Sequence, residues 1–195
     1  MASLDLVAAR FVPQYRSAGL PDGEPWGSSN GNCGPTSIVN ALRLVGLDVP
    51  GFAGQRSQAV IDAARQLATG SAEISAPTLK TQQAFALRAA GADVHVSRSL
   101  SDTLAAVRDG AAALIGGNRA AAGWPRRPDD LPATGVANHA SVIAGWQPGD
   151  GTYLVDDPAL AAPVAVTPAQ LAAFTQVVRG VDMLRPALLV RPRVA

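Results

Sequence analysis

The chain contains a single cysteine and two histidines among its 195 residues. One cysteine excludes an intramolecular disulfide and any metal site built from several thiolates. Sixteen basic residues against fifteen acidic ones leave a formal net charge of +1, so the chain lacks the strong positive field that attracts nucleic acid. We therefore expect no nucleic-acid partner, no metal and no other cofactor.

Long hydrophobic runs are also missing. Nothing approaches the roughly 18 consecutive apolar residues of a membrane-spanning helix, and residues 1–30 lack the cationic start and apolar stretch of a secretory signal. These absences favour a cytoplasmic protein with no membrane-inserted segment. Export by a signal-independent machine would leave no mark in the sequence, and the oligomeric state stays open.

Apolar residues are abundant, and at 48% of the chain they suffice for one sizeable core. We predict a single α+β domain over residues 1–195, with residues 1–27 as an N-terminal extension. Helical spacing of apolar residues predicts helices over residues 35–45, 57–68, 78–91, 99–110 and 167–178. Extended patterns predict an antiparallel sheet built from residues 92–97, 111–117, 139–146, 152–157, 162–167 and 187–192. Residues 5–15 fit either a short helix or an edge strand.

Residues 118–138 form an unusually long connection between two predicted strands. This connection contains Trp124 and the stretch WPRRPDD. Loops of this length in compact domains are commonly functional. Two interpretations stay open: a lid in which Trp124 contacts substrate, and a surface excursion whose indole packs on the core.

Cys33 lies in the stretch SSNGNCGPTS, at the start of the predicted helix over residues 35–45. The thiolate is the form that attacks carbonyl carbons, and a helix N-terminus lowers a thiol pKa from its usual value of about 8.5. Pro35 is favoured in a first helical turn, and Gly34 would let a substrate carbonyl approach the backbone. A single cysteine is more often a core residue, but this setting also suits a nucleophile whose own N–H donates to an oxyanion.

A neighbouring imidazole would activate this thiol. His95 lies between two valines inside a predicted strand, whereas His139 lies where the long connection enters a strand, a common place for catalytic groups. We therefore expect His139 to be the base. The next strand ends at Asp156 and Asp157, and because successive residues face opposite sides, only one of these carboxylates can reach the imidazole. The other is expected to cap the turn at Pro158.

Each of these residues taken alone has an ordinary structural interpretation. A hydrogen-bonded surface histidine and a turn-capping aspartate are both common. A cysteine at a helix start, a histidine entering a later strand and an aspartate ending the next strand form a combination that chance seldom arranges. Together they indicate a nucleophile with its base and an orienting carboxylate.

The stretches NCGPTSIVNAL, NHASVIAGW and YLVDDPAL, the last followed by VTPAQLAAF, resemble papain-like cysteine peptidases of the bacteriocin-processing type. Those enzymes cut leader peptides after a double glycine. The resemblance spans most of residues 28–175 and implies a papain-like fold. It also implies that Cys33 is the nucleophile, His139 the general base and acid, and Asp157, directly before proline, the orienting residue. Asp156 remains an alternative.

The resemblance further implies an oxyanion-hole glutamine six residues before the cysteine. Gly27 occupies that position in this chain. Asn30 or Asn32 could supply an amide from a nearer position. Glycine in place of this glutamine would lower activity, because loss of one oxyanion donor typically costs about a hundred- to a thousandfold in rate.

These features lead us to expect a thiol hydrolase that cleaves an amide bond of a peptide or protein substrate through an acyl-enzyme. One alternative is a glutamine or asparagine deamidase or acyltransferase of the bacterial toxin and effector type. Another is a binding domain that has lost catalysis together with the oxyanion glutamine. A free-standing member could be a housekeeping peptidase or an effector. Because no transporter segments accompany it, we do not expect the leader-processing role of a full transporter.

Overall fold

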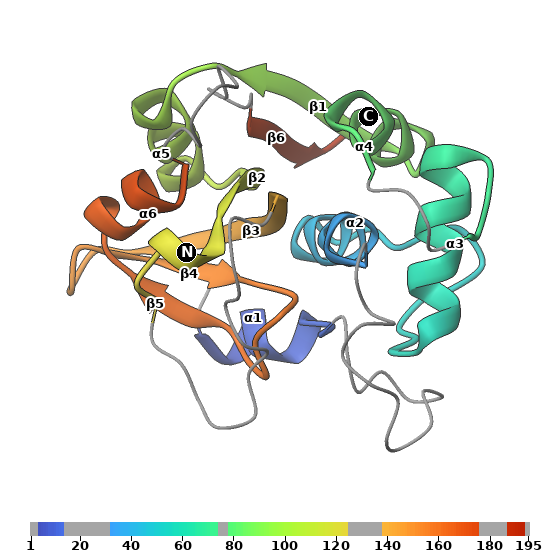
Figure 1. The fold of residues 1–195 in the computed structure, drawn as a ribbon, viewed down its shortest axis with the longest axis horizontal. Helices are drawn as coiled ribbons and strands as arrows, with labels where there is room; N and C mark the ends of the chain where they lie inside the picture. Colours follow the sequence, from blue (N-terminus) through green and yellow to red (C-terminus); the bar gives the residue numbers. More distant parts are fainter. Residues whose placement is uncertain (1–3, 14–31, 74–77, 125–137, 176–186, 194–195) are drawn as a thin grey trace.

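A computed structural model describes residues 4–13, 32–73, 78–124, 138–175 and 187–193 (Figure 1). The helices are α1 (Leu4–Arg10), α2 (Cys33–Leu44), α3 (Gln58–Thr69), α4 (Lys80–Ala89), α5 (Leu100–Arg108), α6 (Pro168–Thr175) and the short 3-10 helix η2 (Arg119–Ala121). The strands are β1 (Ala92–Ser97), β2 (Ala112–Asn118), β3 (Asn138–Gln147), β4 (Thr152–Asp156), β5 (Val164–Val166) and β6 (Ala187–Pro192).

The six strands form one sheet in the order β1-β6-β2-β3-β4-β5, and every neighbouring pair is antiparallel. The final strand, β6, lies between β1 and β2, so the end of the described chain joins the two halves of the sheet. β3 is hydrogen-bonded on both edges, to β2 and to β4. A strand held on both edges is a rigid base for a functional side chain.

Side chains of the sheet alternate between two apolar cores. Leu114 of β2 and Val142 of β3 belong to the core that contains residues of α2, α3 and α4. Their neighbours Ile115 and Ile143 belong to the opposite core, with residues of α5 and α6. Figure 1 shows the same division, with α3 and α4 on one side of the molecule and α5 and α6 on the other.

Helix α2 is buried along nearly its whole length, from Gly34 to Arg43. The apolar spacing predicts one buried stripe, but the structure also buries polar residues such as Thr36 and Ser37. The reason is that α2 contacts β3 on one side, α3 and α4 on another, and α1 as well. Gly46 follows the helix with a φ of 77°, the left-handed conformation expected of a residue that ends a helix.

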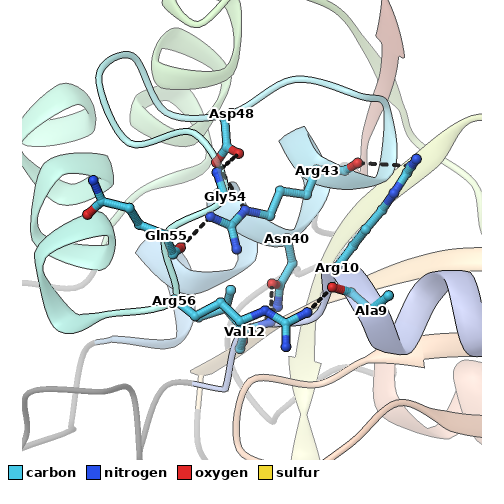
Figure 2. A network of polar contacts seen from close by, with 9 residues as sticks. All are labelled: Ala9, Arg10, Val12, Asn40, Arg43, Asp48, Gly54, Gln55 and Arg56. Carbon is cyan, nitrogen blue, oxygen red and sulfur yellow. Dashed lines mark hydrogen bonds and ion pairs between the residues drawn. The ribbon is translucent and has the colours of Figure 1, made fainter.

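Polar contacts attach the N-terminal segment to α2 (Figure 2). Asn40 Oδ1 accepts a hydrogen bond from the Val12 N–H at 2.8 Å, and Asn40 Nδ2 donates to the Val12 carbonyl at 3.0 Å. Arg10 donates to the carbonyls of Arg43 and Leu44, both at 3.0 Å. These bonds satisfy carbonyls that the end of a helix leaves without intrahelical partners.

The same network attaches α2 to the loop that follows it. Arg43 Nε donates to Asp48 Oδ1 at 3.0 Å, and Arg43 also donates to the Gln55 carbonyl. The other oxygen of Asp48 accepts from the Gly54 N–H at 2.8 Å. Arg43 therefore has structural partners at the C-terminal end of α2, the opposite end from Cys33.

The predicted α+β class and the antiparallel sheet are confirmed. Every predicted helix and strand has a counterpart in the structure, although residues 176–178 of the last predicted helix lie outside the described residues. The segment that fitted a helix or an edge strand forms α1. The single domain over residues 1–195 and the extension over 1–27 stay predictions. Within the described ranges, no helix has the length and apolar character needed to cross a membrane.

Candidate active site

Cys33 is the first residue of α2 and is partly exposed, whereas the ten residues that follow it, Gly34 to Arg43, are buried. The first turn of a helix carries N–H groups without intrahelical acceptors and the positive end of the helix dipole. The thiol is thus accessible at the one end of a buried helix where negative charge is favoured. The predicted position of this residue at a helix start is correct.

His139 and Asp157 are in direct contact. His139 lies in β3, opposite Gly117 of β2, and Asp157 directly follows β4. His139 Nε2 lies 2.5 Å from Asp157 Oδ1, and both side chains are buried. Asp157 Oδ1 also accepts a hydrogen bond from the Ala159 N–H at 2.9 Å, which fixes the carboxylate against the turn. The ring is therefore held with Nε2 toward the carboxylate.

The second partner of His139 is Cys33. The two side chains are hydrogen-bonded, and because Nε2 is committed to Asp157, Nδ1 is the ring nitrogen left for the thiol. Burial raises the pKa of Cys33, but the hydrogen bond and the charge of His139, with a backbone hydrogen bond from Ala140, outweigh it and lower the pKa overall. This environment favours the thiolate.

The imidazole is correspondingly held in its charged form. Burial lowers the pKa of His139, but the charge and hydrogen bond of Asp157, followed by those of Cys33, raise it to about 10. Burial raises the pKa of Asp157, and the charge and hydrogen bond of His139 outweigh this effect and lower it. The shifts of all three groups therefore favour a thiolate, an imidazolium and a carboxylate side by side.

Arg119 is a further member of this group that sequence reasoning missed. It lies in η2, directly after β2, and its Nε donates to Asp157 Oδ2 at 3.2 Å. Its terminal nitrogen also donates to the Ala159 carbonyl at 3.4 Å. Asp157 is thus held by a cation on one oxygen and by His139 on the other. No local pattern marks Arg119, because 38 residues separate it from Asp157.

Asp156, the alternative orienting residue, does not contact His139. It is fully buried and pairs with Val142, so it points toward the core that contains α2. Within the described part of the chain, neither of its carboxylate oxygens has a hydrogen-bond partner, and burial raises its pKa well above the usual value. The expectation that the second aspartate caps the turn is wrong, because Asp157 makes both the imidazole contact and the turn contact.

Trp124, the candidate substrate contact of the long connection, is a buried core residue in the structure. Its side chain is 6% exposed and stacks on Phe174 of α6, with ring centroids 4.7 Å apart. Phe174 in turn forms a T-shaped pair with His139, with ring centroids 6.5 Å apart. The interpretation in which the indole packs on the core is the correct one, and the two rings form an apolar wall behind the imidazole. Residues 125–137, which include the rest of the proposed lid, lie outside the described residues.

Gly34 was expected to admit a substrate carbonyl, but the structure gives the glycine another role. A Cβ at Gly34 would lie 1.9 Å from Thr78 Oγ1 and 3.0 Å from Gln83 Nε2. The absent side chain therefore makes room for the segment that leads into α4. This close packing of α4 on α2 is reason enough for a glycine beside the nucleophile.

The two candidate oxyanion asparagines have different outcomes. Asn30, together with Gly27, lies outside the described residues. Asn32 directly precedes α2 and is buried, and its Oδ1 accepts a hydrogen bond from Arg65 of α3. Arg65 has a signal in the sequence, since it lies four residues after the buried Ile61 and so on the apolar face of α3.

His95 lies away from this group, in agreement with the choice of His139. It belongs to β1, the edge strand, and two strands, β6 and β2, separate β1 from β3. Its side chain is 68% exposed and lies 3.0 Å from Asp93 of the same strand. Among the residues that the structure describes, no cluster of histidine, cysteine, aspartate or glutamate has the arrangement of a metal site.

Comparison with known proteins extends this description. No family model and no curated protein sequence matches the chain. The peptidase domain of Streptococcus ComA, a bi-functional ABC transporter involved in a quorum sensing pathway, matches with a TM-score of 0.56 over 95% of this chain and 99% of that chain, at 12% identity. The protein has a papain-like fold.

A second solved structure with this papain-like fold also matches. It is a double glycine motif protease from an AMS/PCAT transporter in complex with the leader peptide, with a TM-score of 0.50 and 16% identity over 83% of this chain and 84% of that chain. At such identities the likeness concerns the fold. The expected papain-like fold, on which the resemblance to bacteriocin-processing peptidases depends, is confirmed.

Proposed function

We propose that the protein is a cysteine peptidase that uses Cys33, His139 and Asp157 as its catalytic triad. The observation that carries this proposal is the hydrogen-bonded chain from the Cys33 thiol through the His139 imidazole to the Asp157 carboxylate. That chain occurs at the N-terminus of a helix buried in a papain-like fold. The helix dipole and the imidazolium both stabilise the thiolate, and Asp157 acts through the imidazolium, whose pKa it raises.

The reaction follows from these positions. The Cys33 thiolate attacks the carbonyl carbon of an amide, and the carbonyl oxygen becomes an oxyanion near the first turn of α2. His139 gives its Nδ1 proton to the departing amine, which leaves an acyl-enzyme and a neutral imidazole. The imidazole then takes a proton from water, the hydroxide attacks the thioester, and the thiolate and imidazolium are restored. Asp157 keeps the ring oriented throughout.

The oxyanion is stabilised by the backbone N–H of Cys33 and the side-chain amide of Asn32. Both groups are adjacent in sequence to the attacking sulfur, and Asn32 takes the place of the glutamine whose position is occupied by Gly27. Donors fixed in position before the reaction lower the barrier because they need no reorganisation when the charge develops. The substrate class is an extended peptide, a choice supported by the leader peptide bound to the second structural relative.

A related thiol amidohydrolase, a glutamine or asparagine deamidase, would use the same atoms. Mass spectrometry of bacterial and host proteins incubated with wild-type enzyme and with Cys33→Ala separates the two reactions. New peptide termini that depend on Cys33 support the peptidase, whereas a gain of about one dalton on a glutamine or asparagine would identify a deamidase. No change in either case would leave a non-catalytic binding domain and overturn the proposal.

A further inference from the structure

Arg65 is an arginine with no exposed surface, buried between α3 and the start of α2. A buried guanidinium is costly unless it is paired and hydrogen-bonded. Its terminal nitrogen donates to Oδ1 of Asn32, the residue directly before the nucleophile. One partner of this buried cation is therefore a neutral amide directly before Cys33.

The Asn32 side chain has one possible orientation in this contact. An arginine can only donate hydrogen bonds, so the amide oxygen must face Arg65 and the amide NH2 group must face away from it. Asparagine at the position before a helix usually caps it by accepting a backbone N–H, but Asn32 makes no such side-chain bond. Its oxygen is used by Arg65 instead, so the NH2 group is the part of the side chain left to donate to another acceptor.

Charge gives a second link between Arg65 and the nucleophile. Burial lowers the pKa of Arg65, and the negative charges of Asp62 and of the Cys33 thiolate oppose that change. Attraction is mutual, so the guanidinium stabilises the thiolate as the thiolate stabilises the guanidinium. The charged groups around the sulfur are then Arg65 from α3, His139 from β3 and Asp157 after β4.

We propose that Arg65 is a positioning residue of the nucleophile, which fixes the Asn32 amide as an oxyanion donor and adds a buried positive charge behind the Cys33 thiolate. This inference rests on the proposed function and explains how the site works without a glutamine at Gly27. Arg65 does not touch the substrate. It acts through Asn32 and through its charge.

Two reactions of the same thiol separate these contributions. Alkylation by iodoacetamide forms the carbon–sulfur bond and releases iodide without any oxyanion, so its pH profile reports the thiolate alone. Acylation by p-nitrophenyl acetate passes through a tetrahedral oxyanion before nitrophenolate leaves. The ratio of the acylation rate to the alkylation rate therefore reports oxyanion stabilisation, and neither measurement requires the natural substrate.

Arg65→Met is expected to raise the midpoint of the alkylation profile, because a nearby positive charge is lost. It should also lower the acylation-to-alkylation ratio about tenfold or more. Asn32→Ala should lower the ratio but leave the midpoint within about 0.3 pH unit of wild type. Arg43→Met is the matched control, since Arg43 is also buried but bonds to Asp48 and Gln55 at the far end of α2.

If Arg65→Met does not fold, Asn32→Asp tests the donor with Arg65 retained. The carboxylate would remove the NH2 group, so the acylation-to-alkylation ratio should fall; the ratio is the readout of this variant, because the new negative charge beside Cys33 raises the midpoint by itself. A midpoint and a ratio equal to those of wild type and Arg43→Met would overturn the role of Arg65. A wild-type midpoint at the ordinary thiol value of about 8.5 would instead overturn the proposed function itself.

Discussion

The His139 ring and the Asp157 carboxylate meet across the ends of two neighbouring strands, with Nε2 of the histidine 2.5 Å from Oδ1 of the aspartate. The contact is buried and is joined on its other side by Arg119. It holds the imidazole toward Cys33 and, together with the hydrogen bond and charge of Cys33, raises the pKa of His139 to about 10 against the opposing effect of burial. The consequences of this contact can be measured on single side chains.

Asp157→Asn is expected to lower the pKa of His139 substantially. The substitution keeps the shape of the side chain but removes the charge that is the largest favourable influence on the imidazolium. An NMR titration of the two histidine rings measures this directly, with the exposed His95 as an internal control. A His139 pKa that stays near 10 in the variant would mean that Asp157 is not the group that charges the ring.

Arg119→Gln is expected to destabilise the protein by about 1–3 kcal/mol at neutral pH, because it removes a buried hydrogen bond to a carboxylate. The pKa of Asp157 is lower in the folded state than in the unfolded state. The ionised carboxylate therefore stabilises the fold at a pH above its unfolded-state pKa, and this stabilisation is lost as the pH falls through its folded-state pKa. The destabilisation caused by Arg119→Gln should therefore be largest at pH 7 and become smaller below about pH 4.

Denaturant unfolding of wild type and Arg119→Gln at several pH values provides this measurement. Arg108→Gln is a suitable control, because Arg108 donates to the neutral Tyr153 hydroxyl at 2.8 Å. Its effect on stability should not vary between pH 3 and 7. A destabilisation by Arg119→Gln that is equally independent of pH would contradict an ion pair with Asp157.

Asp156→Asn is expected to become more stable relative to wild type as the pH rises. Burial raises the pKa of Asp156 in the folded state. The free energy of unfolding of wild type is therefore highest below the unfolded-state pKa of 3.8, where Asp156 is protonated, and falls as the pH rises toward the folded-state pKa. The asparagine does not titrate, so the difference should change by up to about 1.4 kcal/mol per pH unit in that window. The exposed Asp150→Asn serves as the control in thermal unfolding between pH 4 and 8.

Gly34→Ala is expected to destabilise the fold by about 1–3 kcal/mol, because the new methyl would overlap Thr78 Oγ1. The double variant with Thr78→Ala should recover part of that loss, since it removes the nearest atom. Unfolding midpoints of the two single variants and the double variant give the coupling between the sites. Purely additive effects would show that the Thr78 contact is not the reason for the glycine.

Local patterns were sufficient to predict the elements and the placement of the main site residues. The apolar spacing after Cys33 predicts α2, and the position of His139 at the entry to β3 follows from the long connection before it. Alternation along β4 predicts that one of Asp156 and Asp157 can face the imidazole. Which of the two does so depends on how β4 pairs with β3, where the register shifts between Ile143 and Gly145.

Contacts between distant segments could not be predicted in this way. Arg119 reaches Asp157 only because β2 and β4 flank β3 in the sheet, an order that no short pattern contains. The burial of Trp124 depends on Phe174 of α6, 50 residues later in the chain. The need for glycine at position 34 arises from Thr78, so a local explanation through substrate access was incomplete.

The pH profile of Cys33 alkylation by iodoacetamide tests the central claim most directly, because the chain has no other thiol. In wild type the rate should reach half its plateau well below the ordinary thiol pKa of about 8.5. In His139→Ala the midpoint should rise to that value or above, since burial then acts without the imidazolium, whereas His95→Ala should match wild type. A wild-type midpoint near 8.5 that His139→Ala leaves unchanged would contradict the assignment of Cys33 as an activated nucleophile.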